Sequence, residues 1–199
     1  RHVFSVAASE WGYKSLKGIF EEVTIPKEPH HRIRRISKDE LAAMWHYLAE
    51  QRNPAHLLIA QLALKTGMRR SELLNLTFKD IQTDVIEIKT SKSGHPRLVP
   101  YTNEADRIIK QIEKGEPDDS IFDITINSIR LAWERARKKA CITNLRFHDL
   151  RHEAISRMLE HGLSIAEVAA VSGHKDYKSL FRYSHMDVRK IAKKLNTRN

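Results

Sequence analysis

One segment in the C-terminal half of the chain combines a helical apolar pattern with side chains that bind anions. Its apolar residues recur at spacings of three and four, which is typical of a helix that packs one face on a core: Phe147, Leu150, Ala154, Ile155 and Met158. Arg151 falls inside this stripe, and His148 lies one turn earlier on the same side. Because a guanidinium keeps its proton, a buried arginine needs an anion. The pattern indicates a binding spot for a phosphate or a carboxylate, with an internal Arg–Asp or Arg–Glu pair as the alternative.

Further reactive side chains follow helix ends and a hairpin elsewhere in the sequence. Arg69 comes after a glycine and opens a predicted helix, where free backbone N–H groups favour an anion. Lys92 lies at the tip of a predicted hairpin, His174 ends a helix, and Tyr183 lies near the end of the next helix. Each has a simpler interpretation: an Arg69–Glu72 pair, a solvated turn lysine, a histidine helix cap and a packed tyrosine ring.

The overall charge favours a polyanionic partner. The 199 residues include 35 Lys and Arg against 25 Asp and Glu, a formal charge of +10, which indicates nucleic acid first and an anionic membrane surface second. With 41% hydrophobic residues, the chain can bury one core and a small appendage. No apolar run approaches the roughly 20 residues of a bilayer span, and no signal-peptide pattern opens the chain, so we expect a soluble cytoplasmic protein associated with the nucleoid and not with membrane.

Two further features of the composition concern the compartment and the ends of the chain. Cys141 is the single cysteine, which excludes an internal disulfide and a cysteine-based zinc site and indicates a reducing compartment. The chain opens at Arg1, without a methionine and in the middle of a helical pattern. We therefore expect it to be part of a longer protein.

The elements that position the reactive side chains can be predicted from caps and periodicity. Ser37 and Glu40 form a capping box for a helix that runs to about residue 52, and an apolar helix over 54–65 follows it. After a short helix at 71–76 the pattern changes to strands within 81–90 and 97–99, around a turn at 91–95. Further helices are predicted at 102–114, 125–140, 147–161, 164–171, 176–184 and 187–195. The predicted fold class is mainly α with a small antiparallel β-sheet, that is, α+β.

The chain divides by composition into parts of unequal size. Residues 1–12 resemble the end of a helix, residues 13–35 form a basic linker, residues 36–186 form the main domain, and residues 187–199 form an amphipathic tail. The linker carries Arg32, Arg34 and Arg35, which could lie against a DNA backbone or form a solvated charged strand.

Together these segments resemble the tyrosine recombinase (phage integrase) family. The family pattern has an arginine in Thr-Gly-Leu/Met-Arg-x-x-Glu-Leu, a hairpin lysine, a His-x-x-Arg-His helix, a Gly-His and a downstream tyrosine. All occur here in order over about residues 36–186, with 23 residues from Arg69 to Lys92 and 23 from Arg151 to His174. The stretch 147–157 is similar to phage and plasmid integrases, including shufflon-type invertases, which suggests a mobile element. Tyr101 stands where the family more often has leucine, and we predict that it packs and is not a nucleophile.

The resemblance implies a site-specific DNA recombinase that cuts and rejoins DNA. Tyr183 would attack the scissile phosphate to give a 3′-phosphotyrosine, while Arg69 and Arg151 bind the non-bridging oxygens. Lys92 would protonate the leaving 5′-oxygen, and His148 would accept the proton of the phenol.

The remaining implied roles are supporting ones. His174 would donate a hydrogen bond to a phosphate oxygen, and Glu72 would orient the active-site cations, with His152 as a further supporting residue. No cofactor is implied, neither metal nor ATP. The implied partners are double-stranded DNA at specific sites, further copies of the chain in a tetramer on DNA held through the C-terminal tail, and accessory DNA-bending proteins. By the same resemblance, residues 1–12 would be a remnant of an upstream core-binding domain and 36–186 the catalytic domain.

Two other classes of function fit parts of this sequence. His148 and His152, at i and i+4, could hold zinc, but metalloproteases with this spacing need a glutamate where this chain has Asp149 or Arg151. An arginine beside a dication is repelled, which disfavours zinc. A DNA-binding or architectural relative without catalysis would use the same positive charge. Against that alternative, every candidate catalytic position holds a competent residue.

Overall fold

The computed structural model describes residues 2–16, 18, 34–89, 96–181, 183 and 196. The chain forms two compact units, Arg1–Arg32 and Ile33–Asn199. The described part of the first unit contains the helix α1 (His2–Ser9) and the 3-10 helix η1 (Lys14–Leu16). That this unit is the remnant of a core-binding domain, within the predicted boundaries, stays a prediction.

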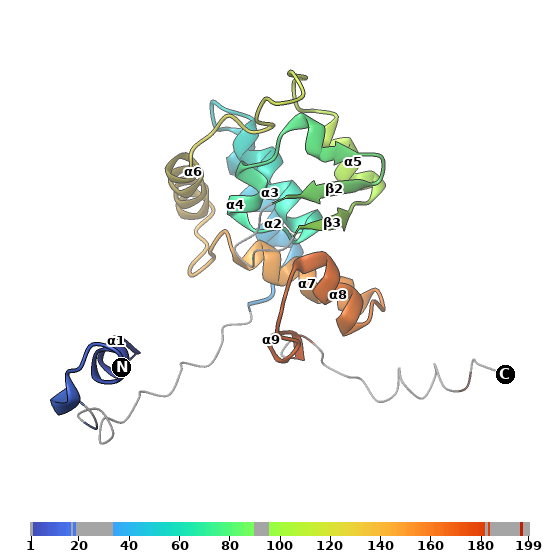
Figure 1. Ribbon diagram of the computed structural model, residues 1–199. Helices are drawn as coiled ribbons and strands as arrows, with labels where there is room; N and C mark the ends of the chain where they lie inside the picture. The colour runs from blue at the N-terminus through green and yellow to red at the C-terminus, as the bar shows by residue number, and fades with distance from the viewer. Residues whose placement is uncertain are drawn as a thin grey trace. The chain divides into compact units, whose positions relative to one another are not determined.

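The second unit is mainly helical with one small sheet, as predicted (Figure 1). Its helices are α2 (Lys38–Ala49), α3 (Ala55–Thr66), α4 (Arg70–Leu74), η2 (Phe78–Asp80), α5 (Asn103–Ile109), α6 (Ile126–Lys139), α7 (Asp149–Glu160), α8 (Ile165–Ser172) and α9 (Lys178–Phe181). The predicted helix over 102–114 is shorter in the structure, as is the one over 176–184. The predicted helix at 187–195 lies outside the described residues. No helix in the described residues has the length and apolar character needed to cross a membrane.

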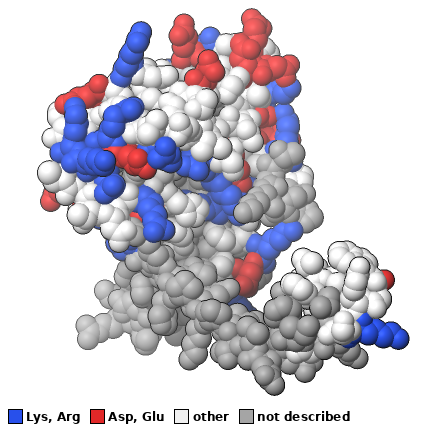
Figure 2. All heavy atoms as spheres, turned by 90° about the vertical axis from the view of Figure 1, so that its left-hand side faces the viewer, with Lys and Arg blue, Asp and Glu red and all other residues white. Residues whose placement is uncertain are grey.

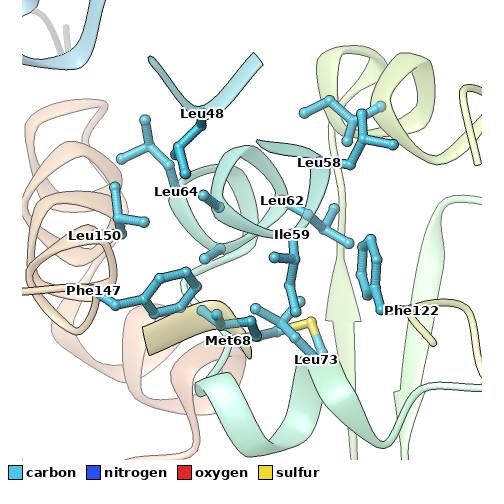
Figure 3. Close-up of a cluster of buried hydrophobic side chains, with 14 of the residues drawn as sticks. Leu48, Leu58, Ile59, Leu62, Leu64, Met68, Leu73, Phe122, Phe147 and Leu150 are labelled. Atoms are coloured by element: carbon cyan, nitrogen blue, oxygen red, sulfur yellow. The ribbon is translucent and has the colours of Figure 1, made fainter. Parts of the chain in front are cut away.

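The helix α3 forms the centre of the core, as its nearly continuous apolar sequence predicts. It packs against α2, α5 and α7. The buried side chains of α3 and of the elements around it that Figure 3 labels are Leu48, Leu58, Ile59, Leu62, Leu64, Met68, Leu73, Phe122, Phe147 and Leu150. Because the stripe of α7 is buried against this cluster, the polar groups on that face of α7 are held inside the domain.

Two predicted helix ends place the residues that follow them. The capping box of α2 is present, with Ser37 Oγ accepting from the Glu40 N–H at 3.1 Å. Gly67 ends α3 in the left-handed region, at φ 67°, and its N–H donates to the Ala63 carbonyl. A Cβ there would be strained, so glycine is favoured at this turn. The reversal sends the chain directly into α4, whose N-cap is Arg69.

The sheet is antiparallel with strand order β1-β2-β3, from β1 (Ile81–Gln82), β2 (Val85–Ile88) and β3 (Arg97–Pro100). Ile86 pairs with Val99, and both are buried. The tip of the hairpin, residues 90–95 with Lys92, lies outside the described residues. Tyr101 packs against the core and donates its hydroxyl to the Gln82 carbonyl at 2.9 Å, so the prediction that it is a packing residue is confirmed.

Arg34 and Arg35 lie in the segment predicted to be a linker, but in the structure both form ion pairs with side chains of the helical domain. Arg34 pairs with Glu40, the capping residue of α2. Arg35 pairs with the buried Glu153 of α7 at 2.9 Å, and with Glu160. These carboxylates neutralise much of the charge that was expected to face DNA, so contact with a DNA backbone stays a prediction for both residues. Arg32 lies outside the described residues.

A buried histidine makes the stability of the domain depend on pH. The ring of His56 is buried, its Nε2 lies 2.7 Å from Ser128 Oγ, and its Nδ1 has no hydrogen-bond partner among the described residues. Burial, and then the charge of Arg135, lower the pKa of His56. The unfolded chain therefore binds a proton at a pH where folded His56 does not, and stability falls as the pH drops below about 6.5.

We expect a His56→Leu variant to lose part of this acid sensitivity. The drop in Tm between pH 7.5 and pH 5.5, measured by calorimetry, should be smaller in the variant than in the wild type. His46→Gln on α2 is the matched control, because the His46 side chain is exposed. An acid-induced drop in Tm that is equal in wild type and His56→Leu would contradict this assignment.

Candidate active site

Arg151 is buried on α7, where the apolar stripe predicts it. The residue is only 3% exposed, and its Nη1 and Nη2 donate to the carbonyl oxygens of Gly67 and Ser172 at 2.5 and 2.7 Å. Within the described residues the guanidinium forms no ion pair with a carboxylate, so this part of the chain gives no support to the alternative of an internal Arg–Asp or Arg–Glu pair. Burial, and then the charge of Arg69, lower the pKa of Arg151 to about 9. The group is still a cation at neutral pH, and no carboxylate in the described part of the chain is bonded to it.

Arg69 also reaches the turn that follows α8. Its Nη2 donates to the Gly173 carbonyl at 3.0 Å, and its Nη1 donates to Glu72 Oε1 at 2.7 Å. Arg69 and Arg151 therefore bind the consecutive carbonyls of Ser172 and Gly173. The two guanidinium groups that the sequence predicted to act together do converge on one place in the fold.

A third arginine, Arg97, belongs to this cluster and was missed in the sequence. Its Nε donates to the Val171 carbonyl at 2.9 Å, and its Nη1 and Nη2 donate to the two oxygens of Glu72 at 2.9 and 2.7 Å. Three consecutive carbonyls at the C-terminal end of α8, those of Val171, Ser172 and its C-cap Gly173, thus each accept from a different guanidinium. This end of a helix carries partial negative charge, which favours bound cations. Strand alternation could have found Arg97, because it shares the inward face of β3 with the buried Val99.

Glu72 holds Arg69 and Arg97 in place. The side chain is buried, and it also accepts the backbone N–H of Arg69 at 2.8 Å. Burial by itself raises the pKa of this carboxyl, but hydrogen bonds from Arg97 and Arg69 outweigh it and lower the pKa to about 2. Glu72 is therefore ionised, and its contacts fit the predicted supporting role.

His174 follows α8, and its ring is oriented by a serine. The Nδ1 atom lies 2.6 Å from Ser172 Oγ, and the same hydroxyl donates to the Val168 carbonyl at 2.5 Å. Because a hydroxyl has one proton to donate, Ser172 must accept at Nδ1, so His174 carries a proton on that nitrogen. The ring is thereby fixed beside the carbonyls to which Arg69 and Arg151 bind.

Tyr183 lies next to His152. The tyrosine is 6% exposed, and its hydroxyl makes a hydrogen bond with Nδ1 of His152. The two rings are stacked, with centroids 5.7 Å apart and an interplanar angle of 27°. Tyr183 also lies close enough to Arg151 for a negative charge on its oxygen to raise the pKa of the guanidinium.

His148 is placed differently from the prediction. The predicted helix over 147–161 begins two residues later, at Asp149, so His148 is its N-cap residue and is exposed. Its ring contacts His152 edge to face, with centroids 4.7 Å apart, and makes no hydrogen bond among the described residues. Desolvation of its ring by neighbouring groups, and then the charge of Arg151, lower the pKa of His148. That His148 accepts the proton of the phenol stays a prediction, and in the structure His152 makes the direct contact.

A basic hollow of about 740 Å³ adjoins His148 and Arg69. Its basic lining residues are Arg69, Arg70, Arg130, Arg137, Arg146 and His148, with Glu134 as the acidic one. Figure 2 shows Lys and Arg side chains gathered across the middle of the face that carries α6, with acidic side chains mainly toward the top of the view. No group of three or more His, Cys, Asp or Glu side chains converges on a possible metal site in the described part of the chain.

Comparison with known proteins places this helical domain in one family. A model of the phage integrase family matches residues 34–190. The shufflon-specific DNA recombinase of Escherichia coli is 36% identical over 199 residues, which cover 98% of this chain and 51% of that protein. The integrase of Salmonella phage P22 is 29% identical over 82% of this chain and 46% of its own length. The catalytic domain of bacteriophage HP1 integrase superimposes with a TM-score of 0.65 at 25% identity, over 77% of this chain and 88% of that one.

The chain belongs to the phage integrase family, that is, to the tyrosine recombinases. It spans about half the length of the two curated relatives described above.

Proposed function

We propose that this chain carries the catalytic domain of a site-specific DNA recombinase that cuts and rejoins DNA through a 3′-phosphotyrosine. The observation that carries the proposal is the convergence of Arg69 and Arg151 on the Ser172–Gly173 turn, with Arg151 buried and bound only to carbonyls among the described residues. Arg69 is paired with Glu72, but Arg151 has no carboxylate partner among the described residues, and a phosphodiester would supply an anion. The names of the similar proteins, recombinase and integrase, point the same way.

The chemistry follows from the groups present. Planar guanidinium groups match the non-bridging oxygens of a phosphate, where charge accumulates in the transition state, so Arg69 and Arg151 take the electrophilic role that a metal has elsewhere. The Tyr183 oxygen forms a bond to phosphorus while the bond from phosphorus to the 5′-oxygen breaks. Lys92 gives a proton to that oxygen. A 5′-hydroxyl later attacks the phosphotyrosine and restores the phenol, so the energy of the bond is kept and no ATP is consumed.

The DNA would lie along the basic hollow beside this site. Among the described residues that line the hollow, arginines outnumber carboxylates, since Glu134 is the one acidic residue in the lining. This excess of positive charge suits a phosphate backbone, and besides Arg69 it comes from Arg70, Arg130, Arg137 and Arg146. In keeping with the family, we propose double-stranded DNA at specific sites as the partner, a tetramer on DNA held through the residues after 186, and accessory DNA-bending proteins. A catalytically silent DNA-binding relative is the alternative, and it would use the same hollow.

The test is covalent capture. A library of nicked duplexes with randomised sequence is incubated with the chain, and protein–DNA adducts that survive denaturing detergent are isolated and sequenced. Mass spectrometry of the adduct should place the nucleotide on Tyr183. DNA binding without any adduct would support the alternative, a DNA-binding relative without catalytic activity. Attachment at another residue would refute Tyr183 as the nucleophile.

Adduct formation should not depend on a divalent metal. Since guanidinium groups replace the metal in the proposed site, EDTA should change the rate of adduct formation on the selected duplex by less than about 3-fold, with ionic strength held constant because DNA binding depends on salt. A rate that collapses in chelator and returns with magnesium would contradict the proposal.

A further inference from the structure

The histidine in contact with the proposed nucleophile is His152, which the sequence analysis gave only a supporting role. The Tyr183 hydroxyl is hydrogen-bonded to Nδ1 of His152, and the two rings stack at 5.7 Å. Tyr183 is buried, whereas His152 is half-buried between it and His148. A phenol held in this way meets the first requirement of general-base catalysis, which is that the base lies within hydrogen-bond reach of the proton.

We propose that His152 is the catalytic base that accepts the proton of Tyr183, a step that rests on the proposed function. His148 lies one ring further away and touches His152 edge to face, at 4.7 Å between centroids. It also lines the basic hollow, together with Arg69. The geometry therefore divides the two histidines: His152 serves the phenol, and His148 serves the phosphate side of the site.

The proton transfers balance in both directions. In cleavage, the O–H bond of Tyr183 breaks, its proton moves to Nδ1 of His152, and the oxygen uses the freed pair to bond to phosphorus. The 5′-oxygen leaves with a proton from Lys92. In rejoining, a 5′-hydroxyl attacks phosphorus, and the His152 Nδ1–H returns its proton to the tyrosine oxygen as that bond breaks.

The local sequence explains why the rings of His148 and His152 lie next to each other. His148 and His152 are four residues apart, so they lie on one face of the α7 segment, and Arg151 beside them is anchored by the Gly67 and Ser172 carbonyls. The anchored arginine fixes the rotation of α7, and with it the position of the neighbouring His152. His152 then presents Nδ1 to the tyrosine that follows α9.

The experiment combines substitution, chemical rescue and a modified substrate. Adduct formation is followed in single-turnover reactions on the nicked duplex selected with the wild-type chain. His152→Ala should reduce the rate by roughly 10²–10⁴-fold. Imidazole should restore much of it, whereas pyrazole, a ring of the same size but far weaker as a base, should not. His152→Gln keeps a hydrogen-bonding side chain without a base, and it should be as slow as His152→Ala.

A duplex with sulfur in place of the bridging 5′-oxygen separates the base from the acid. A thiolate leaves without a proton, so Lys92→Met should recover on this substrate, whereas His152→Ala should stay slow. A wild-type rate for His152→Gln, equal rescue by pyrazole, or rescue of His148→Ala and not of His152→Ala would each overturn the inference. Failure of the proposed function itself is distinct, because the wild type would then form no adduct at Tyr183.

Discussion

Tyr183→Phe forms no covalent adduct on the selected nicked duplex, and it still binds that duplex. The expected loss is at least roughly 10⁴-fold in rate, because the substitution removes the attacking oxygen itself. Binding should be unchanged within about 3-fold, since in the proposed site Arg69 and Arg151, on separate elements, hold the phosphate. Adducts are measured on denaturing gels, and binding by fluorescence anisotropy at fixed salt.

Tyr101→Phe is the matched control. Both tyrosines donate or share a hydrogen bond through the hydroxyl, Tyr101 with the Gln82 carbonyl and Tyr183 with His152. Each variant loses about 1 kcal/mol of stability on this account, so a general effect of losing a hydroxyl appears equally in both. Adduct formation by Tyr183→Phe, or its loss in Tyr101→Phe, would show that the nucleophile is misassigned.

Local sequence signals predicted the elements that carry the site. The capping box at Ser37, the glycine end of α3 at Gly67 and the alternation in β2 are each set by neighbours along the chain, and the structure has all three. The stripe of α7 also predicted that Arg151 is buried, because helical spacing alone decides which side chains face the core.

The partners of the charged residues could not be predicted in the same way. Arg97 bonds to Glu72 and to the Val171 carbonyl, which lie 25 and 74 residues away in the sequence. Spacing on one helix cannot reveal which of His148 and His152 meets Tyr183 either, since both share a face. That choice depends on how the chain after α8 packs back on α7, which is a tertiary contact.

Arg34 and Arg35 show a further limit, because their acidic partners cannot be found from the local sequence. A run of basic residues beside prolines is typical of a linker, and the composition of the segment gives no sign of an acidic partner. Glu153 pairs with Arg35 from 118 positions further along, so the pair exists only after α7 has packed. The sequence therefore gives the sign of the net charge, but it does not show which charged side chains are paired within the fold.

Glu72→Gln is expected to destabilise the domain and to slow adduct formation. The variant keeps the shape of the side chain but removes the negative charge, so the guanidinium groups of Arg69 and Arg97 lose their ionised partner in a buried place. Removing one member of a buried pair costs about 3–5 kcal/mol, which corresponds to a fall in Tm of roughly 10 °C in a domain of this size. A displaced Arg69 should also lower the rate of adduct formation, by roughly 100-fold.

The acid dependence of this effect follows from the pKa of Glu72, which is lowered from 4.5 to about 2 in the fold. A carboxyl with a lowered pKa contributes stability that is fully present above its unfolded pKa and is lost as the pH falls toward the folded value. The difference in Tm between wild type and Glu72→Gln should therefore be constant above about pH 5.5 and should shrink as the pH approaches 2. Glu50→Gln, which breaks an exposed pair with Lys139, should change Tm little throughout.

The double variant Glu72→Gln/Arg97→Met decides whether uncompensated charge is the cause. If it is, removing Arg97 relieves part of the repulsion between the guanidinium groups of Arg69 and Arg97, and the double variant is more stable than Glu72→Gln alone. A double-mutant cycle measures this coupling directly. Purely additive losses would instead mean that Glu72 acts by packing. The rate of adduct formation separates the two consequences: neither variant has the Glu72 carboxylate that holds Arg69, so stability should recover in the double variant more than catalysis does.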